Sequence, residues 1–234
     1  MRQKIASIAQ RLRIPAVCPF CSHYHRGKYA ACDDCSSLLV HIGNACTICC
    51  LPLTDNIIGP CGNCIKQKPA FDQVITAYCF EEPLRTFLHE FKYKQALYLR
   101  SFMVKLMCDA LTITSYTPGC LVPVPMHAKR LKERGFNQAA ELTKLLARKM
   151  RLTYDLTLCE KTINTVPQVY LNAKQRKRNL HQGFRAYPTA HRHITLIDDL
   201  LTTGSTADEL ALILKKQGVE KVDVWCLART AQSK

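Results

Sequence analysis

Hydrophobic and polar positions change their pattern near residue 68 of the chain. In residues 1–68, cysteines, turn residues and short polar segments dominate, whereas in residues 69–234 apolar runs alternate between strand-like and helix-like periods. The segment Gln67-Lys68-Pro69 lies at the change of pattern and is the expected junction. The sequence therefore predicts a small module in residues 1–68 and a larger domain in residues 69–234.

The larger domain carries an alternating series of strand and helix patterns. Residues 73–80, 120–124 and 156–159 are short runs rich in apolar, β-branched or aromatic residues, which predict strands. Residues 84–106 carry an apolar face that predicts two helices, and residues 137–150 form a clear amphipathic pattern. These elements alternate along the chain, which is typical of a layered α/β domain.

The C-terminal part has the clearest pattern. Residues 194–197 predict a buried strand, residues 206–217 a helix that ends before Gly218, and residues 222–227 a final strand. A strand, a turn, a helix and a second strand at this spacing make a βαβ unit. The predicted class is therefore α/β, with a parallel sheet.

The chain is strongly basic, with a formal net charge of +15 over 234 residues. A charge of this sign favours acidic partners, such as nucleic acid or phosphorylated ligands. A hydrophobic content of 47% argues against a disordered chain. The sequence has no apolar run of membrane-spanning length, and the basic residues 1–15 lack the features of a signal peptide. We therefore expect a cytoplasmic protein without a membrane span.

Cysteines define the chemistry of the first part. Eight of the 14 cysteines form pairs with two residues between the members: Cys18/Cys21, Cys32/Cys35, Cys46/Cys49 and Cys61/Cys64. A two-residue spacer lets one tight turn direct both sulfur atoms at a metal ion, and two such turns complete a tetrahedral four-thiolate zinc site. Without a secretion signal, the pairs favour metal binding over disulfides. The pattern predicts two structural zinc ions, which replace the core that so short a segment can barely build.

Two arrangements of the four pairs are open from the sequence. In the arrangement that we expect, consecutive pairs share a zinc ion, whereas in the rival arrangement the pairs interleave, the first with the third. Cys50 stands beside a paired cysteine and complicates the assignment. His23, His25 and His41 are further candidate ligands, although we expect these histidines on the surface.

The most informative segment is residues 194–206, with the sequence ITLIDDLLTTGST. The apolar strand delivers Asp198 and Asp199 to its C-terminal end, where open α/β sheets bind their ligands. Backbone N–H groups at the start of the next helix suit a phosphate, and the loop adds hydroxyl donors and a permissive glycine: Thr202, Thr203, Gly204, Ser205 and Thr206. The two carboxylates suit the hydroxyls of a sugar, and they can assist Mg²⁺.

An ordinary strand-to-helix turn is the simplest alternative for this segment. The acidic strand of an ATPase is a second one, but it requires a phosphate loop of the form GxxxxGK[ST], which the sequence lacks. The segment resembles the 5-phosphoribosyl-1-diphosphate (PRPP) signature of type I phosphoribosyltransferases. The resemblance implies that Asp198 and Asp199 bind the ribose hydroxyls and that residues 202–206 bind the 5-phosphate.

Two further segments extend the resemblance. Residues 121–138 have the sequence LVPVPMHAKRLKERGFNQ, and residues 167–184 contain Gln168, Leu171, Arg176, Asn179 and Phe184. Together with the cysteine pairs and the PRPP signature, this pattern resembles the ComF family of competence-related proteins over nearly the whole chain. Cys50, Lys161 and Asn164 depart from the pattern, outside the phosphoribose site.

The resemblance implies a type I phosphoribosyltransferase fold behind an N-terminal Cys-rich double zinc ribbon. It places a pyrophosphate loop, where PRPP would bind with Mg²⁺, at Pro123, Val124, Pro125 and Met126. Arg130 and Arg134 are expected to close over this loop or to contact nucleic acid. Further basic candidates for such contacts are Lys129, Arg176 and Arg178.

The function expected from the resemblance is that of a competence factor for natural transformation, which handles incoming single-stranded DNA. The net positive charge favours a surface that follows a nucleic-acid backbone. Two alternatives stay open: an active phosphoribosyltransferase with an unidentified acceptor, and a zinc-ribbon adaptor that docks a helicase or another DNA-processing protein. Whether the chain turns over PRPP is left open, because we identify no base-selecting pocket in the sequence.

Overall fold

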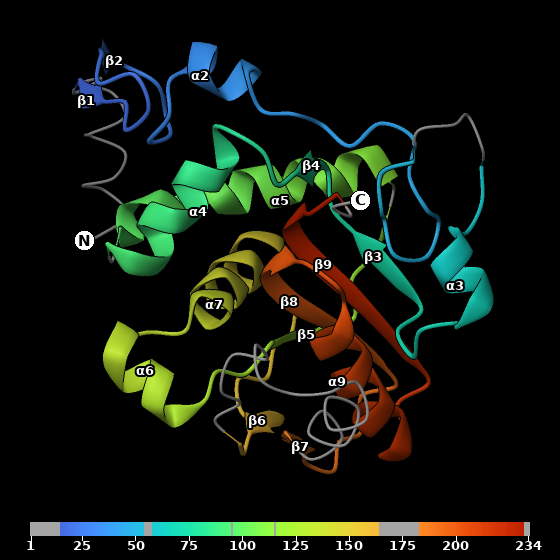
Figure 1. Ribbon diagram of the computed structural model, residues 1–234. Helices are drawn as coiled ribbons and strands as arrows, with labels where there is room; N and C mark the ends of the chain where they lie inside the picture. Colours follow the sequence, from blue (N-terminus) through green and yellow to red (C-terminus); the bar gives the residue numbers. More distant parts are fainter. Residues whose placement is uncertain (1–14, 54–57, 95, 115, 164–182, 232–234) are drawn as a thin grey trace, which may run out of the picture.

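A parallel sheet forms the centre of the molecule (Figure 1). The structure is a computed structural model that describes residues 15–53, 58–94, 96–114, 116–163 and 183–231. One sequence expectation, the basic contacts of Arg176 and Arg178, lies outside the described residues.

The central sheet has five strands. They are β3 (Gln73–Ile75), β4 (Tyr78–Cys79), β5 (Cys120–Pro123), β8 (His193–Leu201) and β9 (Lys221–Arg229). The order is β3, β9, β8, β5, with β4 also paired to β9, and every pairing is parallel. The strands of this sheet are almost continuously apolar, because helices cover both faces of a parallel sheet. The predicted α/β class with a parallel sheet is confirmed.

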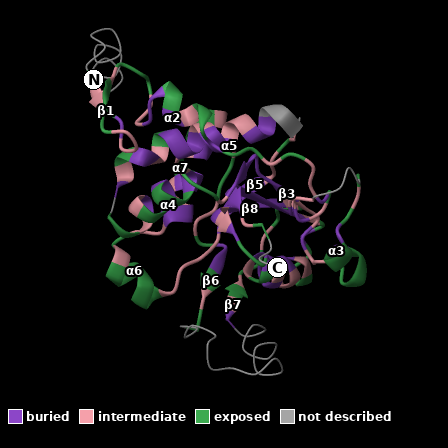
Figure 2. Cartoon of the chain, turned by 45° about the horizontal axis from the view of Figure 1, so that its top comes forward, coloured by how far each residue is buried: buried purple, intermediate pink, exposed green. Residues whose placement is uncertain are grey.

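Helices cover the two faces of this sheet. One face is covered by α4 (Leu84–Tyr93), α5 (Arg100–Thr114) and α7 (Gln138–Met150), and the other by α9 (Ser205–Lys216). Neighbouring residues of β9 point to opposite faces: Trp225 joins the core under α5, and Cys226 joins the core under α9. Figure 2 shows that the buried residues concentrate in the sheet and on the inner sides of these helices.

The N-terminal part divides into two segments that pack on opposite faces of the sheet. The first holds the hairpin β1 (Ala16–Val17) and β2 (Tyr24–His25) with the short helix α2 (Asp33–Ser37), and its Phe20 stacks on Phe87 of α4 with 4.1 Å between ring centroids. The second segment ends in α3 (Gly62–Lys66), and its cysteines belong to the core of the α9 face.

One predicted strand is wrong. Residues 156–158 do not form a strand, because Asp155 holds them in a turn: its Oδ1 accepts hydrogen bonds from the backbone N–H of Thr157 at 2.8 Å and of Leu158 at 3.0 Å. The strand β6 (Cys159–Lys161) begins where this turn ends, and it pairs with β7 (Phe184–Ala186) in a separate antiparallel ribbon.

The other predicted elements differ from the structure mainly at their ends. The run 73–80 is split into β3 and β4, and the short 3₁₀ helix η1 (Leu97–Leu99) precedes α5. The predicted helix 206–217 is confirmed as α9, which begins one residue earlier. The basic stretch after β5 forms an additional helix, α6 (Ala128–Arg134), without a buried residue.

Candidate phosphoribosyl site and cysteine groups

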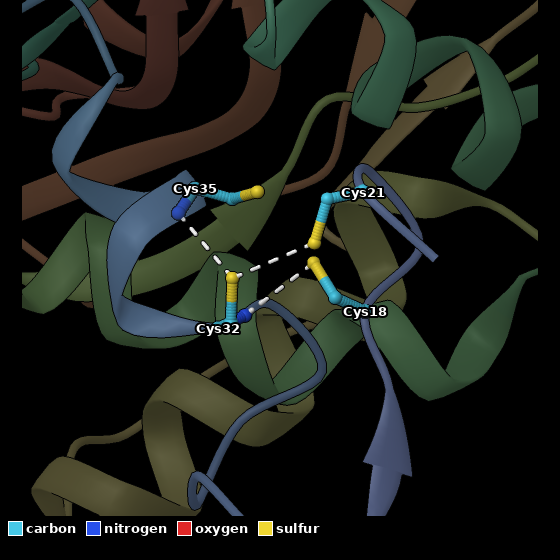
Figure 3. A group of neighbouring side chains, drawn as sticks. All are labelled: Cys18, Cys21, Cys32 and Cys35. Atoms are coloured by element: carbon cyan, nitrogen blue, oxygen red, sulfur yellow. Dashed lines mark hydrogen bonds between the residues drawn. The ribbon is translucent and has the colours of Figure 1, made fainter. Parts of the chain in front are cut away.

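The first four-cysteine group consists of Cys18, Cys21, Cys32 and Cys35 (Figure 3). All four Sγ atoms lie within 4.8 Å of one another. The Cys32 N–H donates to the sulfur of Cys18 at 3.5 Å, and the Cys35 N–H donates to the sulfur of Cys32 at 3.4 Å. Cys32 caps the N-terminus of α2, so the start of this short helix brings the second pair to the first.

The second four-cysteine group consists of Cys46, Cys49, Cys61 and Cys64, again with the sulfur atoms within 4.8 Å of one another. The Cys61 N–H donates to the sulfur of Cys46 at 3.1 Å, and Cys61 is the N-cap of α3. Consecutive pairs therefore come together, as expected, and the interleaved arrangement is wrong.

Both groups have the chemistry of a zinc site. Burial raises the pKa of the Cys18 thiol, but hydrogen bonds from the backbone N–H groups of its turn outweigh burial and lower the pKa to about 6. The same competition lowers the pKa of Cys46 to about 7. Burial and the neighbouring sulfur atoms raise the pKa of Cys35 and Cys64, so one thiol of each group ionises readily and a bound cation would ionise the others. Four converging sulfur atoms fit Zn²⁺, which binds thiolate and leaves no open position in such a group. Cys50 lies outside the groups, where its thiol donates to the carbonyl of Thr76 at 3.9 Å.

The acid pair lies at the carboxyl edge of the sheet. Asp198 and Asp199 follow the buried run of β8, and the Asp199 N–H donates to Oδ1 of Asp198 at 2.8 Å. The Nζ of Lys92, from the last turn of α4, lies 2.9 Å from Oδ1 of Asp199. Burial and the negative charge of Asp199 raise the pKa of Asp198 to about 7. Asp198 is therefore protonated part of the time near neutral pH unless a further cation binds.

The phosphate loop, residues 202–206, joins β8 to α9. Gly204 is the N-cap of α9 and has a φ of +83°, a left-handed conformation that favours glycine. The hydroxyls of Thr203 and Ser205 lie 2.8 Å apart. The first N–H groups of a helix lack partners within the helix, so this turn presents donors and a positive dipole end to an anion.

A small cavity of about 170 Å³ opens beside the acid pair. The structure brings Val124, Pro125 and Met126 of the expected pyrophosphate loop to its wall, together with Thr206 of the phosphate loop. Four cationic side chains also line it: Lys92, Arg130, Arg134 and Lys161. Burial and the nearby charge of Arg130 lower the pKa of Lys161. The cavity thus combines two carboxylates with a surplus of cations, which suits a ligand that carries both hydroxyls and phosphates.

Not every candidate from the sequence reaches this cavity. Pro123 ends β5 behind it, and Lys129 is exposed on α6 without lining it. Thr202, Thr203, Gly204 and Ser205 line a second, larger cavity of about 770 Å³ on the other side of the loop. Lys161 was expected outside the phosphoribose site, but β6 brings it to the wall of this cavity, so that expectation is wrong. Lys92 was missed, because it lies on an element far from the PRPP signature and no motif marks it.

Comparison with known proteins places the chain among DNA-related relatives. It is 32% identical to the DNA utilization protein YhgH of Escherichia coli K12 over 226 residues, which cover 94% of this chain and 99% of that protein. It is also 33% identical to competence protein F of Haemophilus influenzae over 180 residues, 72% of this chain and 78% of that protein. The chain belongs to the ComF family. The competence protein ComFC of Bacillus subtilis is 27% identical over 201 residues, 80% of this chain and 78% of that protein.

The ComF assignment agrees with the architecture: two four-cysteine groups precede a parallel α/β domain of the phosphoribosyltransferase type. A scan against protein-family models finds no match, so the assignment depends on the relatives. Among the described residues, no helix has the length and apolar character needed to cross a membrane.

Proposed function

We propose that this ComF protein acts in DNA uptake, where it handles incoming single-stranded DNA on a scaffold that binds PRPP. The observation that carries the proposal is the acid pair of β8, set between a helix N-terminus and a cation-lined cavity. The names of the relatives, DNA utilization protein and competence protein, support the DNA side of the proposal.

The phosphoribosyl ligand would be held by three groups of contacts. The N–H groups and hydroxyls of residues 202–206 take the 5-phosphate, and Asp198 with Asp199 accepts hydrogen bonds from the vicinal ribose hydroxyls. Lys92, Arg130 and Arg134 face the diphosphate from the cavity wall. Together these contacts would hold the sugar at the acid pair, with the diphosphate in the small cavity and the 5-phosphate at residues 202–206.

The acid pair also fits Mg²⁺. Asp198 and Asp199 offer the hard oxygen ligands that this ion prefers, and the raised pKa of Asp198 marks a carboxylate pair that is short of positive charge. Mg²⁺, when bound, neutralises charge on the diphosphate. Lys92 forms a salt bridge with Asp199 in the structure. Mg²⁺ bound at Asp199 would replace Lys92 in this pair, and the lysine would then be free to contact the ligand.

DNA would bind outside the cavity. The helix α6 has no buried residue and exposes Lys129, Arg130 and Lys132 beside the cavity mouth. A basic surface of this kind binds a nucleic-acid backbone in a salt-dependent and weakly selective manner. The carboxylates of the acid pair repel a polyanion, so we expect the strand to avoid them.

Calorimetric titration of PRPP with Mg²⁺ into the zinc-loaded protein, alone and with a short single strand, tests the proposal. We expect micromolar binding that disappears in the Asp198→Asn/Asp199→Asn variant, while DNA binding persists. Lys129→Ala/Lys132→Ala, on the exposed surface of α6, should weaken DNA binding, whereas Arg148→Ala/Lys149→Ala, which removes the same charge from an exposed part of α7, should not. Absence of PRPP binding in the wild-type protein would refute the phosphoribosyl part of the proposal.

Two other outcomes of the same series would point elsewhere. Release of diphosphate from PRPP in the presence of a nucleobase or amine would identify an active phosphoribosyltransferase, with the cations of the cavity stabilising the departing group. Neither PRPP nor DNA binding, with capture of a DNA-processing helicase by the cysteine groups, would identify a zinc-ribbon adaptor.

A further inference from the structure

The wall behind the phosphate loop is built by the second four-cysteine group. The larger cavity is lined on one side by residues 202–205 and on the other by the ligands Cys49, Cys61 and Cys64. The loop of the candidate sugar-phosphate site and a candidate zinc site thus face each other across one cavity, although more than a hundred residues separate them in the sequence.

Arg229, at the end of β9, connects the two. Its side chain is buried, with the residue only 5% exposed, and its Nε donates to the carbonyl of Cys49 at 3.0 Å. Its Nη1 donates to the carbonyls of Leu201, at 3.1 Å, and Thr202. One guanidinium therefore holds a cysteine of the second group and the first turn of the phosphate loop in a fixed relation.

These contacts also set the direction of the phosphate-binding donors. In a trans peptide the carbonyl and the following N–H point in opposite directions. Because the carbonyls of Leu201 and Thr202 point at Arg229, the N–H groups of Thr202 and Thr203 point away from it. Arg229 thus orients two donors of the loop without touching the ligand.

The charge of the second group matches this arrangement. Zinc held by four thiolates carries a net charge of −2. Among the described residues no carboxylate pairs with Arg229, so its buried charge is compensated by carbonyls and by the neighbouring group. Loss of zinc would expose the group to rearrangement and would leave Arg229 without its anionic neighbour.

Further contacts join the same two parts. The Ala70 N–H donates to Oδ1 of Asp208 in the first turn of α9, and the ring of Phe71 lies 3.6 Å from the position that a Cβ on Gly204 would occupy. The segment that follows the second cysteine group therefore also packs against the loop. The first group differs, because its segment packs on α4 through Phe20 at the other face of the sheet.

We propose that Arg229 is a positioning residue that couples zinc binding by the second four-cysteine group to phosphate binding by residues 202–206, while the first group stays uncoupled. The inference depends on the proposed phosphate site, and it adds that the second zinc ion is part of that site. Linkage makes the coupling reciprocal: zinc promotes phosphate binding, and phosphate retains zinc.

Zinc release into a colorimetric chelator, with and without ribose 5-phosphate, tests the coupling in the wild-type protein. We expect two release rates, of which saturating ribose 5-phosphate slows only one, by about five-fold or more. Phe20→Ala assigns the other rate, because it loosens only the first group. Equal slowing of both rates would mean general stabilisation and would overturn the proposal, as would no slowing under conditions where calorimetry shows that ribose 5-phosphate binds.

A pair of variants tests Arg229 itself. Arg229→Met should speed zinc loss from the second group and weaken ribose 5-phosphate binding, each by about ten-fold, because three carbonyls lose a buried donor. The zinc-loss rate and the ribose 5-phosphate affinity of Arg229→Lys should lie between those of the wild-type protein and Arg229→Met. One ammonium group cannot bridge the same carbonyls as a planar guanidinium. Arg85→Met is the control, because Arg85 lines the same cavity but is exposed and lies over Phe80 instead.

The outcomes separate this inference from the proposed function. If the wild-type protein does not bind ribose 5-phosphate but Arg229→Met still speeds zinc loss from one group, the phosphate site is refuted and the structural link is retained. If ribose 5-phosphate binds and Arg229→Met changes neither the affinity nor either release rate, the coupling is refuted and the phosphate site is retained.

Discussion

Replacement of Asp198 by asparagine should make the folded protein more stable at neutral and alkaline pH. Burial and the charge of Asp199 raise the pKa of Asp198 to about 7, whereas an aspartate in an unfolded chain titrates near pH 3.9. Between these values the folded protein binds more protons than the unfolded chain, so the free energy of unfolding falls as the pH rises. Above about pH 7 this loss of unfolding free energy is complete. Asp198→Asn prevents the loss, because an amide does not ionise.

The magnitude follows from the size of the shift. Three pKa units correspond to about 4 kcal/mol at most. Asp198 is only half-buried, so solvent screens part of its charge. We therefore expect a gain of about 2 kcal/mol at pH 8 and about half of that at pH 5.5. An asparagine oxygen can still accept the Asp199 N–H, which now bonds Asp198 at 2.8 Å, so no hydrogen bond is sacrificed.

Urea denaturation of the zinc-loaded protein from pH 5.5 to pH 8.5 measures the effect, and calorimetry with PRPP measures its functional consequence. The variant should gain stability and lose PRPP binding, as expected of a strained site kept for a ligand. Glu209→Gln is the matched control: burial raises the pKa of Glu209 on α9 to about 7, but this carboxyl does not line the acid-pair cavity. Glu209→Gln should raise the free energy of unfolding with the same pH dependence and leave PRPP binding intact.

A gain independent of pH, or a loss of stability at every pH, would refute this reasoning. The first result would mean that Asp198 does not change its protonation state between pH 5.5 and pH 8.5. The second would mean that the carboxylate makes a contact that an amide cannot replace. In either case burial would not keep Asp198 protonated near neutral pH. The expected affinity of the acid pair for a cation would then need another explanation.

Three further changes have definite expected outcomes. Gly204→Ala forces a side chain into a φ of +83° and should cost about 1–2 kcal/mol of stability, with a parallel loss of ribose 5-phosphate affinity in calorimetry. Phe87→Ala removes a fully buried ring that stacks on Phe20; denaturation should show a loss of about 3–5 kcal/mol, and the first zinc ion should leave faster. Tyr116→Phe deletes a 2.6 Å hydrogen bond to buried Asp223 and should lower the unfolding free energy by about 1.5–3 kcal/mol.

The parts of the fold that the sequence predicts well are those fixed by local pattern. β8, α9 and β9 follow from an apolar run, an amphipathic period and Gly218, which has a φ of +92° just after the helix. The cysteine pairs are equally local, since each two-residue turn needs only its own residues, and the expected sequential arrangement is the one that the structure has.

The parts that were missed depend on contacts between distant segments. The helix α6 has no apolar face to reveal it, and it is defined instead by the cap at His127 and by Gly135, which has a φ of +80°. Lys92 lies on α4, whose apolar positions predict only which face of the helix is buried. No local signal indicates that the ammonium group of Lys92 reaches Asp199. Arg229 lies two residues beyond the predicted strand 222–227, and no local signal indicates that its side chain reaches the carbonyl of Cys49.

The two proposed ligands of this protein differ in a way that the acid pair can distinguish. A free phosphoribosyl compound offers vicinal hydroxyls to Asp198 and Asp199, whereas the sugar of a DNA strand lacks the 2′-hydroxyl and has its 3′-oxygen in a phosphodiester. We therefore expect the carboxylates to repel the DNA backbone and to keep the strand on the basic surface of α6. If so, raising the salt concentration should weaken DNA binding steeply, while PRPP binding, which depends on fixed donors within the cavity, should change far less.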